Sequence, residues 1–205
     1  MTADPPRLKD APPPPRPYHH GDLRAALLHA AEEELAERGM EAFSLRSVAK
    51  RAGVSHAAPA HHFGDAQGLL TALAAEAFRQ FLAAQAAREA VADTDPASQL
   101  VAAGMGYVDF AIARPTLFRL MWQSNRPDFE VPDLGKAARA AFQHLVDQVA
   151  AAGGRSTADE AAVWALAHGL ADLLASNRLR GVGSLDPEAR DAMVAGIIRR
   201  VLPGA

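Results

Sequence analysis

The sequence predicts an all-α protein. β-branched residues are scarce, because Val, Ile and Thr together make up about a tenth of the 205 residues, whereas alanine recurs along the whole chain. Alanine is the strongest helix former, and β-branched side chains are the ones that favour strands. Apolar residues also recur at helical spacing between proline and glycine stops. Together these observations predict helices along the chain beyond a proline-rich start.

The N-terminal tail stands apart, since the first 17 residues contain seven prolines. Proline fixes φ and removes a backbone donor, so residues 1–18 are expected to form a disordered, extended tail rather than part of a core. Arg7, Lys9 and Arg16 give this tail the charge of a basic arm. A first folded domain is therefore expected to begin at residue 19.

Four helices are predicted in the N-terminal half, at residues 22–38, 44–52, 55–61 and 66–90. Asp22, Ser44 and Ser55 are suited to N-caps, whose side-chain oxygen accepts a hydrogen bond from a backbone N–H of the first turn. We assign residues 19–65 to the first domain and residues 66–205 to a second helical domain.

Five further helices are predicted in the second domain, at residues 97–113, 115–122, 133–152, 157–180 and 186–202. Pro115 suits the first turn of a helix, because its fixed φ is helical and its missing N–H needs no partner there. Thr157 and Glu160 have the form of a capping box, in which each side chain accepts from the other residue's backbone N–H.

Composition and charge exclude several classes of protein. The chain is 49% hydrophobic and 22% charged, as in ordinary globular domains, and it has no cysteine for disulfides or thiolate metal sites. No N-terminal apolar run resembles a signal peptide, and the longest uncharged apolar stretch, residues 161–171, is too short to span a membrane. The net charge of −3 means that any nucleic-acid contact comes from a local basic patch. We expect a cytoplasmic protein without a membrane partner.

Residues 44–63 carry the most informative pattern. Two short helices joined by a turn at Gly53 have the form of a helix-turn-helix, which places a helix in the major groove of DNA. Residues 42–62 contain no acid but six residues of basic type: Arg46, Lys50, Arg51, His56, His61 and His62. A phosphate backbone is bound by such a local cationic face. Spacing and charge alone leave two alternatives open, namely DNA binding and a helical hairpin with a solvated charged surface.

Several stretches of the sequence carry a family resemblance. Residues 43–55 read Phe-Ser-Leu-Arg-Ser-Val-Ala-Lys-Arg-Ala-Gly-Val-Ser, followed by His62-Phe63 and Leu69-Leu70. Over about residues 20–75 this pattern resembles the DNA-binding domain of the tetracycline-repressor (TetR) family. Trp164 and His168-Gly169 resemble the Trp-His-Gly signature of one C-terminal ligand-binding domain found in that family. The resemblance implies a repressor that binds double-stranded operator DNA and a small-molecule effector.

The residues expected to contact DNA lie at the starts of the second and third helices and at the end of the third. Arg46 and Ser47 would face phosphates or groove edges. His56 and Ala57 would face base edges, as the first residues of a recognition helix do. The full set is Arg46, Ser47, Lys50, Ser55, His56, Ala57, His61 and His62. For His62 a buried structural role is an equal alternative.

Two positions depart from the family pattern. Ala60 stands where many relatives have Tyr, and Ala66-Gln67 where they have Lys-Glu, and in the family these residues typically contact phosphate. A weakened DNA affinity is one consequence. The rival hypothesis is therefore a helical ligand-binding or adaptor protein that has lost DNA binding.

The second domain contains aromatic and polar residues that either pack in a core or line a pocket for an apolar or aromatic effector. These residues are Tyr107, Phe110, Phe118, Met121, Trp122, Trp164, His168 and Asp172. His168 and Asp172 lie four residues apart, a spacing that also suits a metal site or an acid–base pair. No Gly-rich phosphate loop, nucleophile elbow or His-Glu-x-x-His motif is present, so we expect no enzyme, no cofactor and no metal site.

The resemblance also implies a homodimer. In the family the last helices pair about a two-fold axis, and here these would be residues 157–180 and 186–202. Burial of Ala171, Ala175 and Ala195 between subunits would let the helices approach closely. The two recognition helices would then lie about one DNA turn apart, roughly 34–36 Å.

Overall fold

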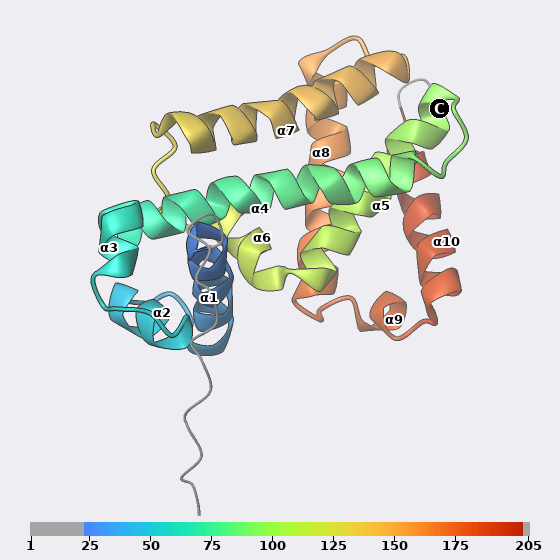
Figure 1. Cartoon of the computed structure of the whole chain (residues 1–205). Helices are drawn as coiled ribbons and strands as arrows, with labels where there is room; N and C mark the ends of the chain where they lie inside the picture. The colour runs from blue at the N-terminus through green and yellow to red at the C-terminus, as the bar shows by residue number, and fades with distance from the viewer. Residues whose placement is uncertain (1–22, 203–205) are drawn as a thin grey trace, which may run out of the picture.

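The computed structural model describes residues 23–202, and within that range it consists of helices and connecting loops without a strand (Figure 1). The helices are α1 (Leu23–Arg38), α2 (Leu45–Arg51), α3 (Ala58–Phe63), α4 (Ala66–Glu89), α5 (Pro96–Ala113), α6 (Pro115–Trp122), α7 (Pro132–Ala151), α8 (Thr157–Ala175), α9 (Arg180–Gly183) and α10 (Pro187–Ile198). The all-α prediction is confirmed. The proline-rich tail and the expected N-cap at Asp22 lie outside the described residues.

Helix α4 is the long central element of the molecule. Figure 1 shows it crossing the whole molecule, with α1 to α3 at one end, α5, α8 and α10 toward the other, and α7 along one side. Its buried face includes Leu69, Phe78 and Phe81. One hydrophobic core continues along it from Leu27 in α1 to Ile198 in α10. The N-terminal helices and the C-terminal helices are therefore packed against a shared helix.

Two helix starts differ from the predicted ones. Helix α3 begins at Ala58 rather than at Ser55, and no side chain caps it. Pro59 lies in its first turn, where the missing N–H of proline is tolerated, and this position sets the start of the helix. The capping box of α8 is formed by Ser156 and Asp159, one residue before the predicted pair, with the Ser156 backbone N–H donating to Asp159 at 3.0 Å.

Helix α8 is also shorter than predicted. It ends at Ala175, and the predicted continuation to residue 180 is replaced by a turn before α9. The Ser176 hydroxyl donates to the backbone carbonyl of Asp172 at 2.6 Å, and Asn177 has a positive φ of 55°. Asparagine tolerates this left-handed conformation, which ends a helix.

Helices α4 and α5 touch backbone to backbone at Gly106. A Cβ added there would lie 2.5 Å from Gln85 Cα and 2.6 Å from the Ala84 carbonyl oxygen. We expect Gly106→Ala to lower the free energy of unfolding by about 2 kcal/mol, because two helix backbones would have to separate. Urea denaturation measures this change.

The comparison variant is Gly104→Ala on the same helix. The added Cβ meets only the side chain of Ile198, whose Cδ1 lies 2.9 Å away and can move. We expect a clearly smaller loss of stability for this variant. Equal stabilities of the two variants would contradict the close approach at Gly106.

Candidate nucleic-acid interface and ligand cavity

The geometry of α2 and α3 is that of a helix-turn-helix. Ser44 caps α2, because its side-chain oxygen accepts from the Ser47 backbone N–H at 3.2 Å. The chain turns at Gly53, whose φ of +68° is in the left-handed region that favours glycine. The three residues that precede α3, Ser55 to Ala57, are exposed. This end of α3 is therefore free to approach a groove.

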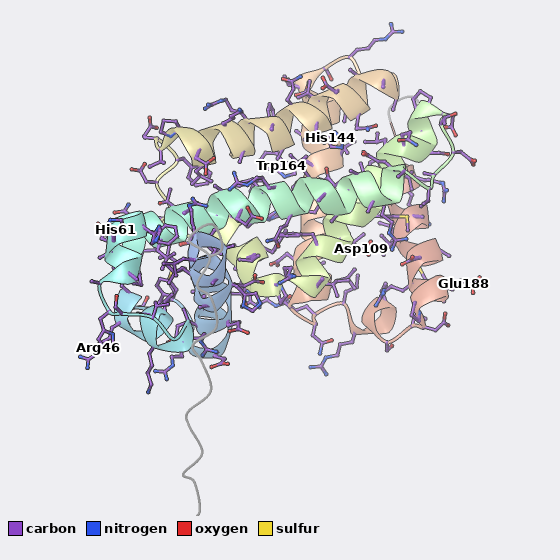
Figure 2. All side chains as sticks on the ribbon, viewed as in Figure 1. Arg46, His61, Asp109, His144, Trp164 and Glu188 are labelled. Carbon is purple, nitrogen blue, oxygen red and sulfur yellow. The ribbon has the colours of Figure 1, made fainter. Side chains whose placement is uncertain are left out.

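Arg46 and Lys50 lie one turn apart on α2, and both are exposed. Figure 2 shows Arg46 pointing outward at the edge of the molecule. Both residues border a surface hollow that Ser47 and His56 also line. Within residues 23–202 no ion pair is found for either cation. Their charges are therefore available to phosphates.

Arg51 does not belong to this free basic face. Its guanidinium donates to Glu34 Oε2 at 3.0 Å and to Glu37 Oε1 at 2.9 Å, and it also contacts Glu37 Oε2. The hydrogen bonds to Glu37 and Glu34 raise the pKa of Arg51, and the bond to Arg51 lowers the pKa of Glu37. Glu34 is almost fully buried, and its Oε1 lies 3.1 Å from Arg38 Nε without hydrogen-bond geometry. Arg51 thus joins α2 to α1, and the basic patch is smaller than its sequence indicates.

The histidines of α3 lie on its last turn. His61 and His62 are both exposed, and Figure 2 shows His61 near the start of α4. The exposed position of His62 contradicts the buried alternative. The neighbouring Phe63 is partly buried and packs against the hydrophobic core. The Arg24 guanidinium lies over its ring, 5.4 Å from the ring centroid. Ala60 is exposed at this surface.

An apolar cavity of about 150 Å³ lies among α4, α5, α7 and α8. Three of the sequence-predicted ligand residues, Tyr107, Trp122 and Trp164, line it. The ring centroids of the two tryptophans are 5.7 Å apart, and that of Phe81 is 4.7 Å from Tyr107. In Figure 2 Trp164 lies between α4 and α7. Aromatic rings from α4, α5, α6, α7 and α8 thus meet at one cavity.

The other predicted ligand residues lie elsewhere. Phe110, Phe118 and Met121 are buried in the core and do not border the cavity. His168 lies behind Tyr107, with its Nδ1 2.8 Å from the tyrosine oxygen. Asp172 accepts from Gln123 at 2.9 Å in a separate surface hollow. The eight residues therefore do not form one site, because the α5, α6 and α8 faces that carry them point in different directions.

Burial disfavours the charged forms of both Tyr107 and His168. It raises the pKa of Tyr107 well above its ordinary value. Burial also lowers the pKa of His168, although the charge of Asp172 opposes the shift. The tyrosine hydroxyl can then donate to the unprotonated His168 Nδ1.

Several cavity residues were missing from the sequence prediction. They are Phe78, Phe81 and Gln85 on α4, Phe129 before α7, and Phe142, His144 and Gln148 on α7. The signal on α7 was the helical spacing of Ala138, Ala141, Phe142 and Leu145, which marks one apolar face.

Comparisons with known proteins point to one family. Residues 27–73 match the model described as bacterial regulatory proteins, tetR family, and residues 100–200 match a tetracyclin repressor-like C-terminal domain. The HTH-type transcriptional regulator BetI of Burkholderia ambifaria is 31% identical over 173 residues, which are 81% of this chain and 87% of the relative. The chain belongs to the tetR family.

Further similarities agree with this membership. BetI of Stenotrophomonas maltophilia is 33% identical over 122 residues, which cover 60% of this chain and 62% of the relative. A solved structure of a protein with unknown function from Rhodococcus sp. RHA1 is 33% identical, with a TM-score of 0.74 and coverage of 92% of this chain and 99% of that one. This tetR-family protein is a DNA-binding transcriptional regulator. None of its described helices is long and apolar enough to cross a membrane.

Proposed function

We propose that this tetR-family regulator is a homodimeric repressor that an apolar or aromatic small molecule releases from operator DNA. Residues 19–65 would read the DNA, and residues 66–205 would bind the effector and the second subunit. The observation that carries the proposal is the aromatic cavity, which lies apart from the basic patch at Arg46 and Lys50. Small-molecule sites are concave and mostly apolar, with a few polar groups.

Helix α6 connects the cavity to the DNA-binding helices. Trp122, its last residue, lines the cavity. Arg114, just before α6, donates to Glu32 of α1 at 2.6 Å, and Gln123, just after α6, donates to Asp172 of α8 at 2.9 Å. A ligand that displaces Trp122 would therefore move a helix that is bonded to α1. Such a ligand shifts the equilibrium only by its differential affinity for the two states.

The surface of α8 and α10 supports the proposed dimer. Leu173 and Met193 are large apolar side chains that are 40% and 47% exposed. Gly169 and Gly196 lie inside these helices, where glycine costs about 1 kcal/mol relative to alanine. A Cβ at either position would meet nothing within 4 Å. No contact within the described chain explains these glycines, whereas close approach of a second subunit does.

The small residues expected at this interface need one correction. Ala171 and Ala195 are buried in the core of the protomer itself, and Ala175 is half-buried. They are turned inward because α8 and α10 pack against α5 with the faces that carry them. Gly169 and Gly196 take their place in the proposed interface.

We expect Gly169→Leu to raise the dimer dissociation constant at least tenfold, because a bulky side chain would separate the two subunits. Sedimentation at micromolar concentration should show a dimer for the parent and mostly monomer for the variant, with unchanged circular dichroism. Ala140→Leu, at an exposed position on α7, is the matched control and should remain dimeric. A monomeric parent, or a fully dimeric Gly169→Leu variant, would contradict the proposed assembly.

A catalytic role for His168 and Asp172 has less support. Their side chains bond to different partners, Tyr107 and Gln123, and so do not face a common substrate position. No group of three or more potential metal ligands occurs among residues 23–202. We propose that the protein acts as a regulator and not as an enzyme, because its relatives are named transcriptional regulators.

The effector part of the proposal is tested by adding small aromatic compounds to a complex of the protein with duplex DNA. Compounds that change tryptophan emission, through Trp122 and Trp164 at the cavity, are expected to release the DNA. A compound that occupies the cavity and leaves DNA affinity unchanged would count against effector release.

A further inference from the structure

One end of the apolar cavity is polar and is held in a fixed arrangement by Glu89. His144 and Gln148 of α7 line the cavity, and Gln85 of α4 lies beside them, almost fully buried. Glu89, the last residue of α4, does not line the cavity. Its Oε1 is 2.8 Å from His144 Nε2 and accepts from Gln148 Nε2 at 2.9 Å. Figure 2 shows His144 near the crossing of α7 and α8.

The two bonds to Glu89 determine what His144 and Gln148 can offer to a ligand. A carboxylate only accepts hydrogen bonds, so Glu89 takes one N–H from His144 Nε2 and one of the two amide N–H groups of Gln148. Gln148 keeps its Oε1 as an acceptor and its second N–H as a donor, and the Gln85 amide carries both kinds of group. The Nε1–H of Trp122, which also lines the cavity, is buried and has no hydrogen-bond partner among the described residues. The polar groups of the cavity therefore offer both acceptors and donors to a ligand.

The charges around the cavity disfavour an anionic ligand. Among the described residues, no Arg or Lys side chain lines the cavity. A carboxylate or phosphate would therefore lose its hydration without gaining a cationic partner, which is unfavourable. Glu89 places a negative charge directly behind His144 and Gln148, so a neutral or positively charged head group is not opposed.

We propose that the effector carries a polar head group that is neutral or positively charged, an amine or a hydroxyl, on an apolar body. This inference rests on the proposed function, since it concerns the ligand of the same cavity. The body lies among Phe81, Trp122 and Trp164, and the head reaches His144 and Gln148. A cavity of about 150 Å³ is of the size that holds a benzene ring, so the body is one small ring or its equivalent.

The test uses four probes that share a phenyl ring and a short tether: 2-phenylethylamine, 2-phenylethanol, propylbenzene and 3-phenylpropionate. Their dissociation constants are measured by calorimetry and by tryptophan emission. We expect the amine or the alcohol to bind about tenfold more tightly than propylbenzene, as one added hydrogen bond allows. We expect 3-phenylpropionate to bind more weakly than propylbenzene.

Gln148→Met tests the role of the Gln148 amide. Methionine keeps the length of the side chain but removes the amide, so the preference for the amine or the alcohol over propylbenzene should fall to about twofold or less. Gln143→Met is the matched control on the same helix. Gln143 is exposed, donates to Asp147 at 2.8 Å and does not line the cavity, so its replacement should leave all four constants unchanged.

The outcomes separate this inference from the proposed function. Equal affinities for the four probes, or a preference for the carboxylate, would overturn the proposed head group and leave the cavity as an effector site. A preference that survives in Gln148→Met would also overturn it. Failure of all four probes to bind would overturn the effector site itself.

Discussion

Replacing Arg46 and Lys50 together by alanine should weaken binding to every DNA duplex and flatten the salt dependence of binding. These are the exposed cations of α2, and no acid pairs with them in the described chain. If each contacts one phosphate in each subunit of a dimer, the slope of log K against log salt should fall in magnitude by about 4. Fluorescence anisotropy of labelled duplexes at several salt concentrations measures the slope.

Two further variants separate phosphate contact from other roles. Arg51→Ala should lower the melting temperature, because it removes a partner of the buried Glu34, and is expected to leave the salt slope nearly unchanged. His56→Ala should change the ranking of DNA sequences, because His56 precedes α3 at the groove-facing end. A double variant that binds duplex as tightly as the parent would show that the basic patch is not the DNA contact.

Filling the cavity with an effector should lower DNA affinity by about five- to 150-fold, the usual range of coupling between two sites. By reciprocity, DNA should weaken effector binding by the same factor. In Arg114→Ala the ion pair with Glu32 is lost, and with it the bond that ties the start of α6 to α1. We expect effector affinity to be unchanged in this variant and DNA release to fall to roughly threefold or less. Paired titrations of DNA and effector measure both constants.

Arg119→Ala is the matched control for this coupling. Arg119 is an exposed cation on the same helix, and no ion pair is found for it among residues 23–202. Its removal should leave both constants close to those of the parent. If Arg114→Ala couples effector and DNA as strongly as the parent does, the path through α6 and Glu32 is wrong.

Helix content and most helix ends could be predicted from local sequence. Caps such as Ser44 and stops such as Gly53 act within one turn, so their effect is visible without a tertiary structure. The errors arose where two local signals competed. At α3 the position of Pro59 prevailed over the capping potential of Ser55, and at α8 the left-handed Asn177 ended a helix that apolar spacing alone would have extended.

The basic patch could be predicted only in part. Arg46, Lys50 and Arg51 are equivalent in sequence, since all three lie on one short helix without acids. Their roles differ because α1 packs across α2 and brings Glu34 and Glu37 to Arg51 alone. Such a partner lies 14 to 17 residues away in the chain, and the spacing of charges within α2 carries no information about it.

The cavity, too, could be predicted from the sequence only in part. Its aromatic residues on α5, α6 and α8 were predicted because aromatics are few in an alanine-rich domain. The contribution of α7 was not predicted, since the orientation of His144 and Gln148 depends on their hydrogen bonds with Glu89. Glu89 lies more than 50 residues earlier in the chain. Polar groups at a cavity end are identified by their partners in space, which depend on how α4 and α7 pack.

The most direct test of the account is selection of DNA from a random duplex library by the full-length protein. A dimer with one recognition helix per subunit should enrich an inverted repeat whose half-sites are centred about one helical turn, or roughly 10 base pairs, apart. The Arg46→Ala, Lys50→Ala double variant should enrich no such repeat. Failure of the parent to enrich any sequence beyond what this variant retains would contradict the assignment of α2 and α3 as the DNA-reading element.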